Sequence, residues 1–268
     1  MIFEKLFEFK VNEEGFLAMW DFSGKTAVVT GAGGGMGSQV AKDLCAAGSN
    51  VCMIDIKGIP DGFTAFGERV AYCQGDVTDH EFLENTVTET LNRFGGIDYL
   101  INAAGILLFD RDFGVVDTDF AVWDTVMDVN LKSPAKLAQL CIPHMLERTA
   151  SAMVHFSSIG AYRGDSKPQD AYQASKAGLI ELSKSIAIQF ADKGLRSNIV
   201  SPGMIDTPLQ SRWDHQPGAR ETVAAAVPLK RIGRPQDLSN ATLFLLSDFA
   251  SYITGIDLIV DGGLLALP

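Results

Sequence analysis

The feature that most constrains this chain is a strand, a glycine-rich turn and a helix close to its start. Residues 26–30 are a short apolar run that predicts a buried strand, and residues 38–47 predict a helix that ends at Gly48. Between them, residues 31–37 contain five glycines. A helix N-terminus offers backbone N–H groups and a positive dipole end, and glycines let a pyrophosphate approach the main chain. The arrangement favours a nucleotide site over a flexible loop.

The same alternation of strand and helix continues to the end of the chain. No internal repeat or low-complexity linker interrupts it, which predicts one doubly wound α/β domain over residues 21–268. Residues 1–20 are an irregular, aromatic-rich N-terminal extension, either loosely attached or packed on the domain or a neighbouring subunit. We expect further strands near 50–54, 69–73, 97–101, 152–156, 196–200 and 256–260, helices near 79–94, 119–148, 172–192 and 235–246, and an irregular stretch over 207–228.

Composition excludes several classes of protein. A length of 268 residues with 47% hydrophobic residues allows a well-packed core, and a net charge of -11 argues against binding nucleic acid or an anionic membrane. The four cysteines and four histidines form no cluster with metal-ligand spacing, so we expect no metal and reduced, mostly buried thiols in a cytoplasmic protein. No apolar run approaches the ~20 residues that cross a bilayer, and the acidic N-terminus is unlike a signal peptide.

Tyr172 and Lys176 form a candidate acid–base pair. Residues four apart on a helix share a face, so the phenol and the ammonium can point into one cleft. A neighbouring ammonium favours the phenolate and brings the phenol closer to proton exchange at neutral pH. The pair alone is weak evidence, because the same spacing is common on ordinary helices.

Polar and small residues follow several expected strands. Asp55 ends the second strand, where a carboxylate can accept from an adenosine ribose and repel a 2′-phosphate. Asp76 reads more simply as a turn or helix-cap aspartate. Residues 102–105 are small and leave room for a ligand at the sheet edge. Asn130, inside an expected helix, either repairs a helix irregularity or holds a water.

Taken in order, these motifs resemble those of the classical short-chain dehydrogenase/reductase family. The family's TGxxxGxG motif is matched by residues 30–37, and its NNAG motif by residues 102–105 with alanine in place of the second asparagine. Its YxxxK motif is matched by Tyr172 and Lys176, and its PG motif by residues 202–203. The resemblance implies a single Rossmann-type domain with a seven-stranded parallel sheet, order 3-2-1-4-5-6-7, and helices on both faces.

The resemblance, which spans nearly all of residues 22–263, also implies the site residues. The catalytic set is Asn130, Ser158, Tyr172 and Lys176. Ser158 precedes Tyr172 by one residue more than is common in the family, which one extra loop residue would explain. Ser157 is the less favoured candidate for the same role. Asp76 now matches the aspartate that caps the adenine pocket. The cofactor-binding set is Gly31, Gly35, Met36, Gly37, Asp55, Asp76, Val77, Asn102, Ala103, Ala104, Gly105, Tyr172, Lys176, Pro202, Gly203 and Thr207.

The implied activity is hydride transfer between NAD(H) and a secondary alcohol or ketone. Tyr172 would move the proton, Ser158 would hold the substrate oxygen, Lys176 would bias Tyr172 toward phenolate and hold the nicotinamide ribose, and Asn130 would keep a water on the proton path. Asp55 favours NAD over NADP. The resemblance further implies a homo-oligomer, a tetramer in most relatives.

The expected substrate is a small and largely apolar molecule. Arg163 either recognises a carboxylate or phosphate or pairs with Asp165 at the surface. Two alternative functions remain, a carrier-protein-linked 3-oxoacyl reductase and an NAD-sensing protein without turnover. The expected lining is Leu107, Leu108, Phe109, Ile159, Ala161, Tyr162, Arg163, Met204, Leu209, Trp213 and Val223.

Overall fold

A computed structural model describes residues 20–267, so the predicted extension over residues 1–20 lies almost wholly outside the described part. Seven parallel strands form one sheet in the order β3-β2-β1-β4-β5-β6-β7, as predicted. The strands are β1 Thr26–Thr30, β2 Asn50–Asp55, β3 Val70–Gln74, β4 Tyr99–Asn102, β5 Ser151–Phe156, β6 Leu195–Pro202 and β7 Asp257–Val260.

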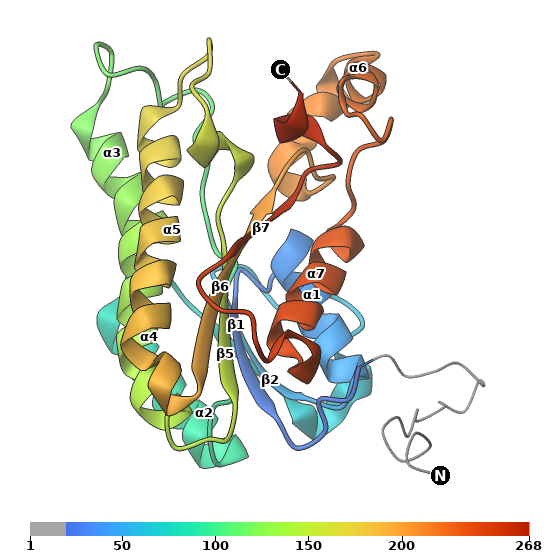
Figure 1. Ribbon diagram of the computed structural model, residues 1–268. Helices are drawn as coiled ribbons and strands as arrows, with labels where there is room; N and C mark the ends of the chain where they lie inside the picture. The colour runs from blue at the N-terminus through green and yellow to red at the C-terminus, as the bar shows by residue number, and fades with distance from the viewer. Residues whose placement is uncertain (1–19, 268) are drawn as a thin grey trace, which may run out of the picture.

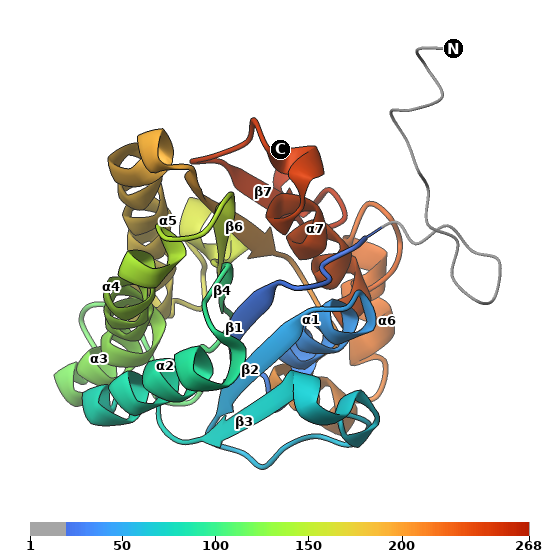
Figure 2. The same cartoon turned by 90° about the horizontal axis from the view of Figure 1, so that it is seen from below.

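Helices cover both faces of the sheet (Figures 1 and 2). On one face lie α2, α3, α4 and α5, and on the other lie α1, α6 and α7. The helices are α1 Gly35–Ala46, α2 His80–Phe94, α3 Phe120–Met127, α4 Ser133–Met145, α5 Asp170–Phe190, α6 Ala219–Ala226 and α7 Pro235–Leu246. In the described part of the chain, no helix has the length and apolar character needed to span a membrane.

The central strands are buried on both faces because helices cover both sides of a parallel sheet. Every residue of β1, β4 and β5 is buried. Along β1 the side chains alternate, so Val28 packs in the core under α2 and α4, and Val29 packs in the core under α1 and α7. The two cores fix the carboxyl ends of the strands at one edge.

Two predicted elements differ from the structure. The helix expected over residues 119–148 is divided into α3 and α4 by a π-helical turn, Asp128–Lys132, that contains Asn130. The stretch over residues 207–228 was expected to be irregular but contains a short 3-10 helix, Pro208–His215, and α6. None of the α6 residues is fully buried, and the helix has only eight residues, which is too short for a sequence pattern to predict it. The other boundaries shift by no more than three residues.

Candidate active site

The glycine turn is folded tightly at its ends and open in the middle. A side chain at Gly31 would place its Cβ 2.8 Å from the backbone of Ala103, and one at Gly37 would place it 2.3 Å from the Gly31 carbonyl oxygen. At Gly34 nothing lies within 4 Å of such a Cβ, and no side chain caps the N-terminus of α1. Gly35 and Met36 start that helix. This open backbone cradle at a helix N-terminus fits a pyrophosphate.

Asp55 stands beside the glycine turn at the carboxyl end of β2. Its Oδ2 accepts a hydrogen bond from the Gly33 N–H (2.8 Å), and its Oδ1 accepts from the Lys57 N–H (2.9 Å). A Cβ at Gly33 would lie 2.6 Å from the Asp55 Cγ, so the carboxylate occupies the space that a side chain there would need. Burial and the Asp55 charge raise the pKa of Tyr72 to about 12. The carboxylate is thus fixed beside the glycine turn, and its contact with an adenosine ribose stays a prediction.

Asp76 makes local contacts in the structure. Its Oδ1 accepts hydrogen bonds from both the N–H and the hydroxyl of Thr78, each at 2.8 Å. Asp79, rather than Asp76, caps α2 by accepting from the Phe82 N–H. The neighbouring Val77 is buried and packs in the core under α2. Asp76 therefore has the turn role that its chemistry suggests, and its contact with adenine stays a prediction.

The end of β4 is joined to β1 and to the catalytic half of the sheet. The Thr30 hydroxyl accepts hydrogen bonds from the N–H groups of Ala103 and Ala104, both at 3.1 Å. A Cβ at Gly105 would lie 3.2 Å from the Lys176 Nζ and 3.4 Å from the Asn130 Oδ1. Residues 103–105 thus run from the glycine turn to the predicted catalytic residues.

Tyr172 and Lys176 lie in the first turns of α5. The Lys176 side chain is buried and the Tyr172 side chain is half-buried. The Lys176 Nζ donates to the Phe156 carbonyl (2.8 Å) and lies 5.8 Å from the centroid of the Tyr172 ring. Burial lowers the pKa of Lys176 to about 8. Burial raises the pKa of Tyr172, and a hydrogen bond with Ser158 opposes that rise. The phenol is therefore displaced away from phenolate, in contrast to the bias that the sequence predicts, because desolvation outweighs the other effects.

The two adjacent serines have different partners. The Ser157 hydroxyl is buried and donates to the Lys176 carbonyl (2.9 Å). The Ser158 hydroxyl accepts from the Gly160 N–H (3.1 Å) at the start of a 3-10 helix, and its interaction with the Tyr172 phenol lowers the pKa of that phenol. Of the two candidates, Ser158 is the one whose hydroxyl reaches the phenol.

Asn130 is held between three elements. Its Oδ1 accepts from the Ile106 N–H (2.8 Å), and its Nδ2 donates to the Ile106 carbonyl (2.9 Å) and to the Ser175 Oγ (3.2 Å). The side chain thus pairs with the backbone that follows β4 and with α5. None of these bonds goes to the backbone of the π-helical turn itself, so both interpretations from the sequence stay predictions.

One pocket brings most of the predicted residues together. Arg163 and Asp165 both line it, yet the Asp165 Oδ1 accepts from the Lys167 N–H (3.0 Å), and the described part of the chain shows no Arg163–Asp165 ion pair. The Gln210 Oε1 is buried and accepts no hydrogen bond from any described residue. The predicted residues in the lining are Met36, Ala103, Gly105, Leu107, Phe109, Ser158, Ile159, Arg163, Tyr172, Lys176, Pro202, Gly203, Met204, Thr207 and Leu209.

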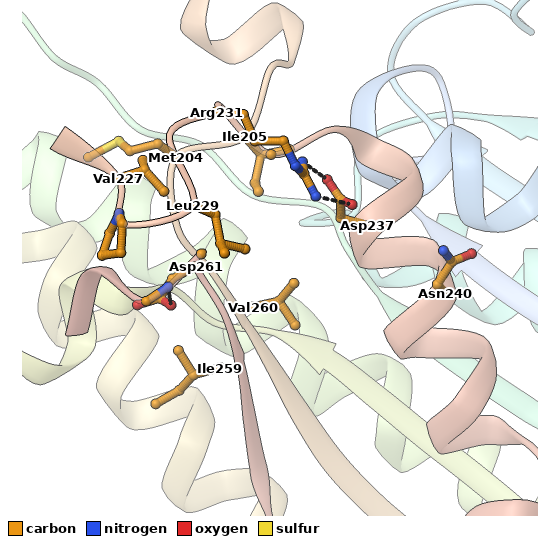
Figure 3. Close-up of a pocket in the computed structure, with 14 residues that line it drawn as sticks. Met204, Ile205, Val227, Leu229, Arg231, Asp237, Asn240, Ile259, Val260 and Asp261 are labelled. Atoms are coloured by element: carbon orange, nitrogen blue, oxygen red, sulfur yellow. Dashed lines mark hydrogen bonds and ion pairs between the residues drawn. The ribbon is translucent and has the colours of Figure 1, made fainter. Parts of the chain in front are cut away.

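Two neighbouring cavities flank this pocket. The predicted lining residues Trp213 and Val223 lie in one of them, which shares Phe109 with the pocket. The other has a volume of about 580 Å³, lies at the carboxyl end of β7 and shares Met204 with the pocket (Figure 3). There Arg231 donates two hydrogen bonds to Asp237, at 2.7 and 2.9 Å. The charge of the Arg231 guanidinium is thus balanced by the Asp237 carboxylate.

His155 has a structural role that the sequence does not reveal. It is fully buried on β5, with its Nδ1 3.0 Å from the Asn102 Nδ2 and its Nε2 3.4 Å from the Ser197 Oγ. Burial, with a smaller effect from the Lys176 charge, lowers the pKa of His155 to about 4. From the sequence, this histidine is examined only as a possible metal ligand. Its pairing with Asn102 could not be predicted, because the two residues are 53 positions apart.

Comparisons with known proteins agree with this geometry. A sequence model described as Enoyl-(Acyl carrier protein) reductase matches residues 31–265. The chain is 35% identical to the 3-oxoacyl-(acyl-carrier-protein) reductase FabG of Thermotoga maritima, over 90% of this chain and 98% of that protein. It is 33% identical to 2-(R)-hydroxypropyl-CoM dehydrogenase of Xanthobacter autotrophicus, over 91% and 99%. A solved aldohexose dehydrogenase from Thermoplasma acidophilum is 31% identical with a TM-score of 0.84, over 92% and 96%.

We expect His155 to make the fold sensitive to acid. Its pKa is about 4 in the folded chain, against an ordinary value of 6.5. Between these values the unfolded chain binds more protons, so the free energy of unfolding falls as pH is lowered from about 6.5 to about 4, by about 3 kcal/mol in total. In His155→Asn, which keeps an acceptor for Asn102, this loss should disappear.

Urea unfolding at a series of pH values from about 4 to about 7 measures this dependence. His80→Asn is the control, because His80 is exposed and pairs only with Glu84 on the surface of α2. The control should follow the wild type. An acid slope that is the same in His155→Asn and in the wild type would assign the loss to other groups.

Proposed function

The chain belongs to the classical short-chain dehydrogenase/reductase family, and from this premise we propose that it transfers a hydride between NAD(H) and a secondary alcohol or ketone. Oxidoreduction of CH–OH groups is common to its named relatives. The observation that carries the proposal is the meeting of Ser158, Tyr172 and Lys176 in one pocket next to the open glycine cradle.

Tyr172 is the proposed proton carrier. Its half-buried phenol interacts with Ser158, whose hydroxyl would hold the substrate oxygen and stabilise the charge that develops on it. When bound, the nicotinamide supplies or accepts the hydride. The raised pKa of Tyr172 keeps the phenol protonated and able to donate to a substrate oxygen.

Lys176 and Asn130 are proposed to support that transfer. The Lys176 ammonium, anchored on the Phe156 carbonyl beside Gly105, would hold the nicotinamide ribose hydroxyls. Its pKa of about 8 places its own proton close to exchange at neutral pH. Asn130, fixed on Ile106, would keep open the proton path toward solvent at the π-helical turn.

The geometry of the fold supports the remaining proposed cofactor contacts. Pro202 and Gly203 leave β6 against Asp261, where a Cβ at Gly203 would lie 2.7 Å from the Asp261 Cα. Thr207 approaches the glycine turn, 3.5 Å from a Cβ built at Gly35. We propose that Thr207 and the unpartnered Gln210 amide oxygen face the nicotinamide carboxamide, which offers N–H donors.

A second candidate function comes from the relatives. The matching family description and FabG both name reductases of acyl groups on a carrier protein. The net charge of -11 and the carboxylate of Asp55 weigh against an acidic carrier and against NADPH. Rates with a panel of free secondary alcohols and ketones, set beside an acetoacetyl carrier-protein thioester, discriminate the two functions. An NAD-sensing protein would bind NAD and turn over none of these compounds.

We also propose a cytoplasmic homotetramer. All four cysteines are free and buried. Large apolar side chains are exposed on α5, where Ile188 is 83% accessible, and next to β7, where Tyr252 is fully accessible and Ile259 is 41% accessible. Apolar groups left in water on two separate elements are typical of subunit contacts. Sedimentation at micromolar concentration should give a mass near four chains, whereas a monomer would refute the assembly and leave the activity untouched.

Tyr172→Phe should abolish turnover and leave NAD binding nearly intact, because it removes the proton-carrying oxygen and keeps the ring. A loss of about 100-fold or more in kcat is expected for a general acid–base group. Steady-state rates and NAD titration by fluorescence measure the two effects. Tyr252→Phe, on a fully exposed tyrosine, is the control and should retain wild-type activity. Substantial activity in Tyr172→Phe would rule out the proposed proton transfer.

The cofactor preference should depend on Asp55. A phosphate at the ribose 2′ position would meet this carboxylate, and like charges at hydrogen-bonding distance in a partly solvated cleft cost about 1 to 4 kcal/mol, or roughly ten- to a thousandfold in kcat/KM. Asp55→Ala should remove most of that preference for NAD over NADP. Asp61→Ala, which changes an exposed carboxylate, should preserve it. Equal use of both cofactors by the wild type, or an unchanged ratio in Asp55→Ala, would contradict the assignment.

A further inference from the structure

The start of α5 is capped by a segment that lies far away in the sequence. Gln169, at the N-cap position, makes no capping hydrogen bond through its side chain. The first helical residue, Asp170, donates its N–H to the Phe113 carbonyl (3.3 Å). The next two N–H groups, of Ala171 and Tyr172, donate to the Asp112 Oδ1 (3.1 Å) and Oδ2 (2.9 Å). Asp112 therefore performs the capping role that the local sequence leaves unfilled.

Both carboxylate oxygens of Asp112 are used in this contact. The residue is only 3% exposed, and a buried carboxylate is costly unless hydrogen bonds or charge compensate it. Two backbone N–H groups and the positive end of the 21-residue helix α5 supply that compensation. The carboxylate and the helix N-terminus thus hold each other in place.

The segment that carries Asp112 is also fixed at its other end. The Ile106 backbone is bracketed by the amide of Asn130, and the Asp112 N–H donates to the Leu108 carbonyl (2.8 Å). Between these anchors, Leu107 and Phe109 form part of the pocket wall. Residues 106–112 therefore connect Asn130 to Tyr172 by way of the wall against which the substrate would rest.

Tyr172 and Lys176 are anchored by different contacts. The backbone of Lys176 is held by the Ser157 hydroxyl and its ammonium by the Phe156 carbonyl. Tyr172 lies in the first helical turn, where Asp112 takes its N–H. The Tyr172 carbonyl is also held by the Ser175 hydroxyl (2.7 Å), so loss of the Asp112 carboxylate would loosen Tyr172 on its N–H side and leave the contacts of Lys176 intact.

We infer that Asp112 is a positioning residue, which fixes the Tyr172 phenol relative to Ser158 and to the pocket wall through the first turn of α5. The inference rests on the proposed function of Tyr172. A small displacement of a reacting group is enough to lower kcat, since catalysis depends on near-attack geometry. Cofactor affinity, to which Lys176 contributes, should change little.

Asp112→Ala and Asp112→Asn test this role, with the ketone that the wild type reduces fastest in the panel above. We expect kcat to fall by about 10- to 100-fold in Asp112→Ala, while the Kd for NAD changes less than about twofold. In Asp112→Asn one oxygen can still accept from one N–H, so kcat should lie between that of the wild type and that of Asp112→Ala. Hydrogen exchange at Ala171 and Tyr172 should accelerate in the same order.

Asp119→Ala is the matched control, because Asp119 caps α3 through the Ala121 N–H (2.9 Å) and is exposed. It removes a helix cap of the same kind and should leave kcat unchanged. A folded Asp112→Ala enzyme with wild-type kcat, or a parallel loss of kcat and NAD affinity, would overturn the inference. If the alanine variant does not fold, wild-type kcat in Asp112→Asn would overturn it as well. Equal rates for the wild type and Tyr172→Phe would instead show that the proposed function itself is wrong.

Discussion

The whole site depends on the close approach of the ends of β1 and β4. Gly31 leaves room for the backbone of Ala103, and the Thr30 hydroxyl accepts from two successive N–H groups of the β4 end. This contact brings the glycine turn, which belongs to one half of the sheet, against residues 103–105, which lead into the other half. Through Gly105 the same backbone reaches Lys176 and Asn130. A side chain at Gly31 would collide with the backbone of Ala103 and Ala104 and so separate the two halves of the site.

Burial sets the protonation of the groups around Lys176. It is the largest cause of the lowered pKa of Lys176, of the lowered pKa of His155 and of the raised pKa of Tyr172. In each case burial stabilises the neutral form of the side chain relative to its charged form. At neutral pH His155 and Tyr172 are therefore neutral, while Lys176, with a pKa of about 8, still carries its charge for most of the time. That charge acts in a region of low effective dielectric constant, where it is screened less than in water.

The sequence predicts well whatever is encoded over short distances. The glycine turn, the strand order and the grouping of Tyr172 with Lys176 follow from local patterns and a family resemblance, and all appear in the structure. Contacts between distant residues could not be predicted. Asp112 reaches Tyr172 across 60 residues, and no local pattern marks it as a helix cap. The π-helical turn at Asn130 and the raised pKa of Tyr172 likewise depend on tertiary packing, which decides hydrogen-bond partners and burial.

The lack of fully buried residues in α6 has a consequence for the cavity beside the catalytic pocket. A helix with no fully buried side chain has few apolar contacts, so opening it requires less free energy than unfolding the sheet. Its residues Thr222 and Val223 line the cavity beside the catalytic pocket, together with Phe109. The lining of this cavity is therefore less stable than the buried strands whose ends carry the candidate site.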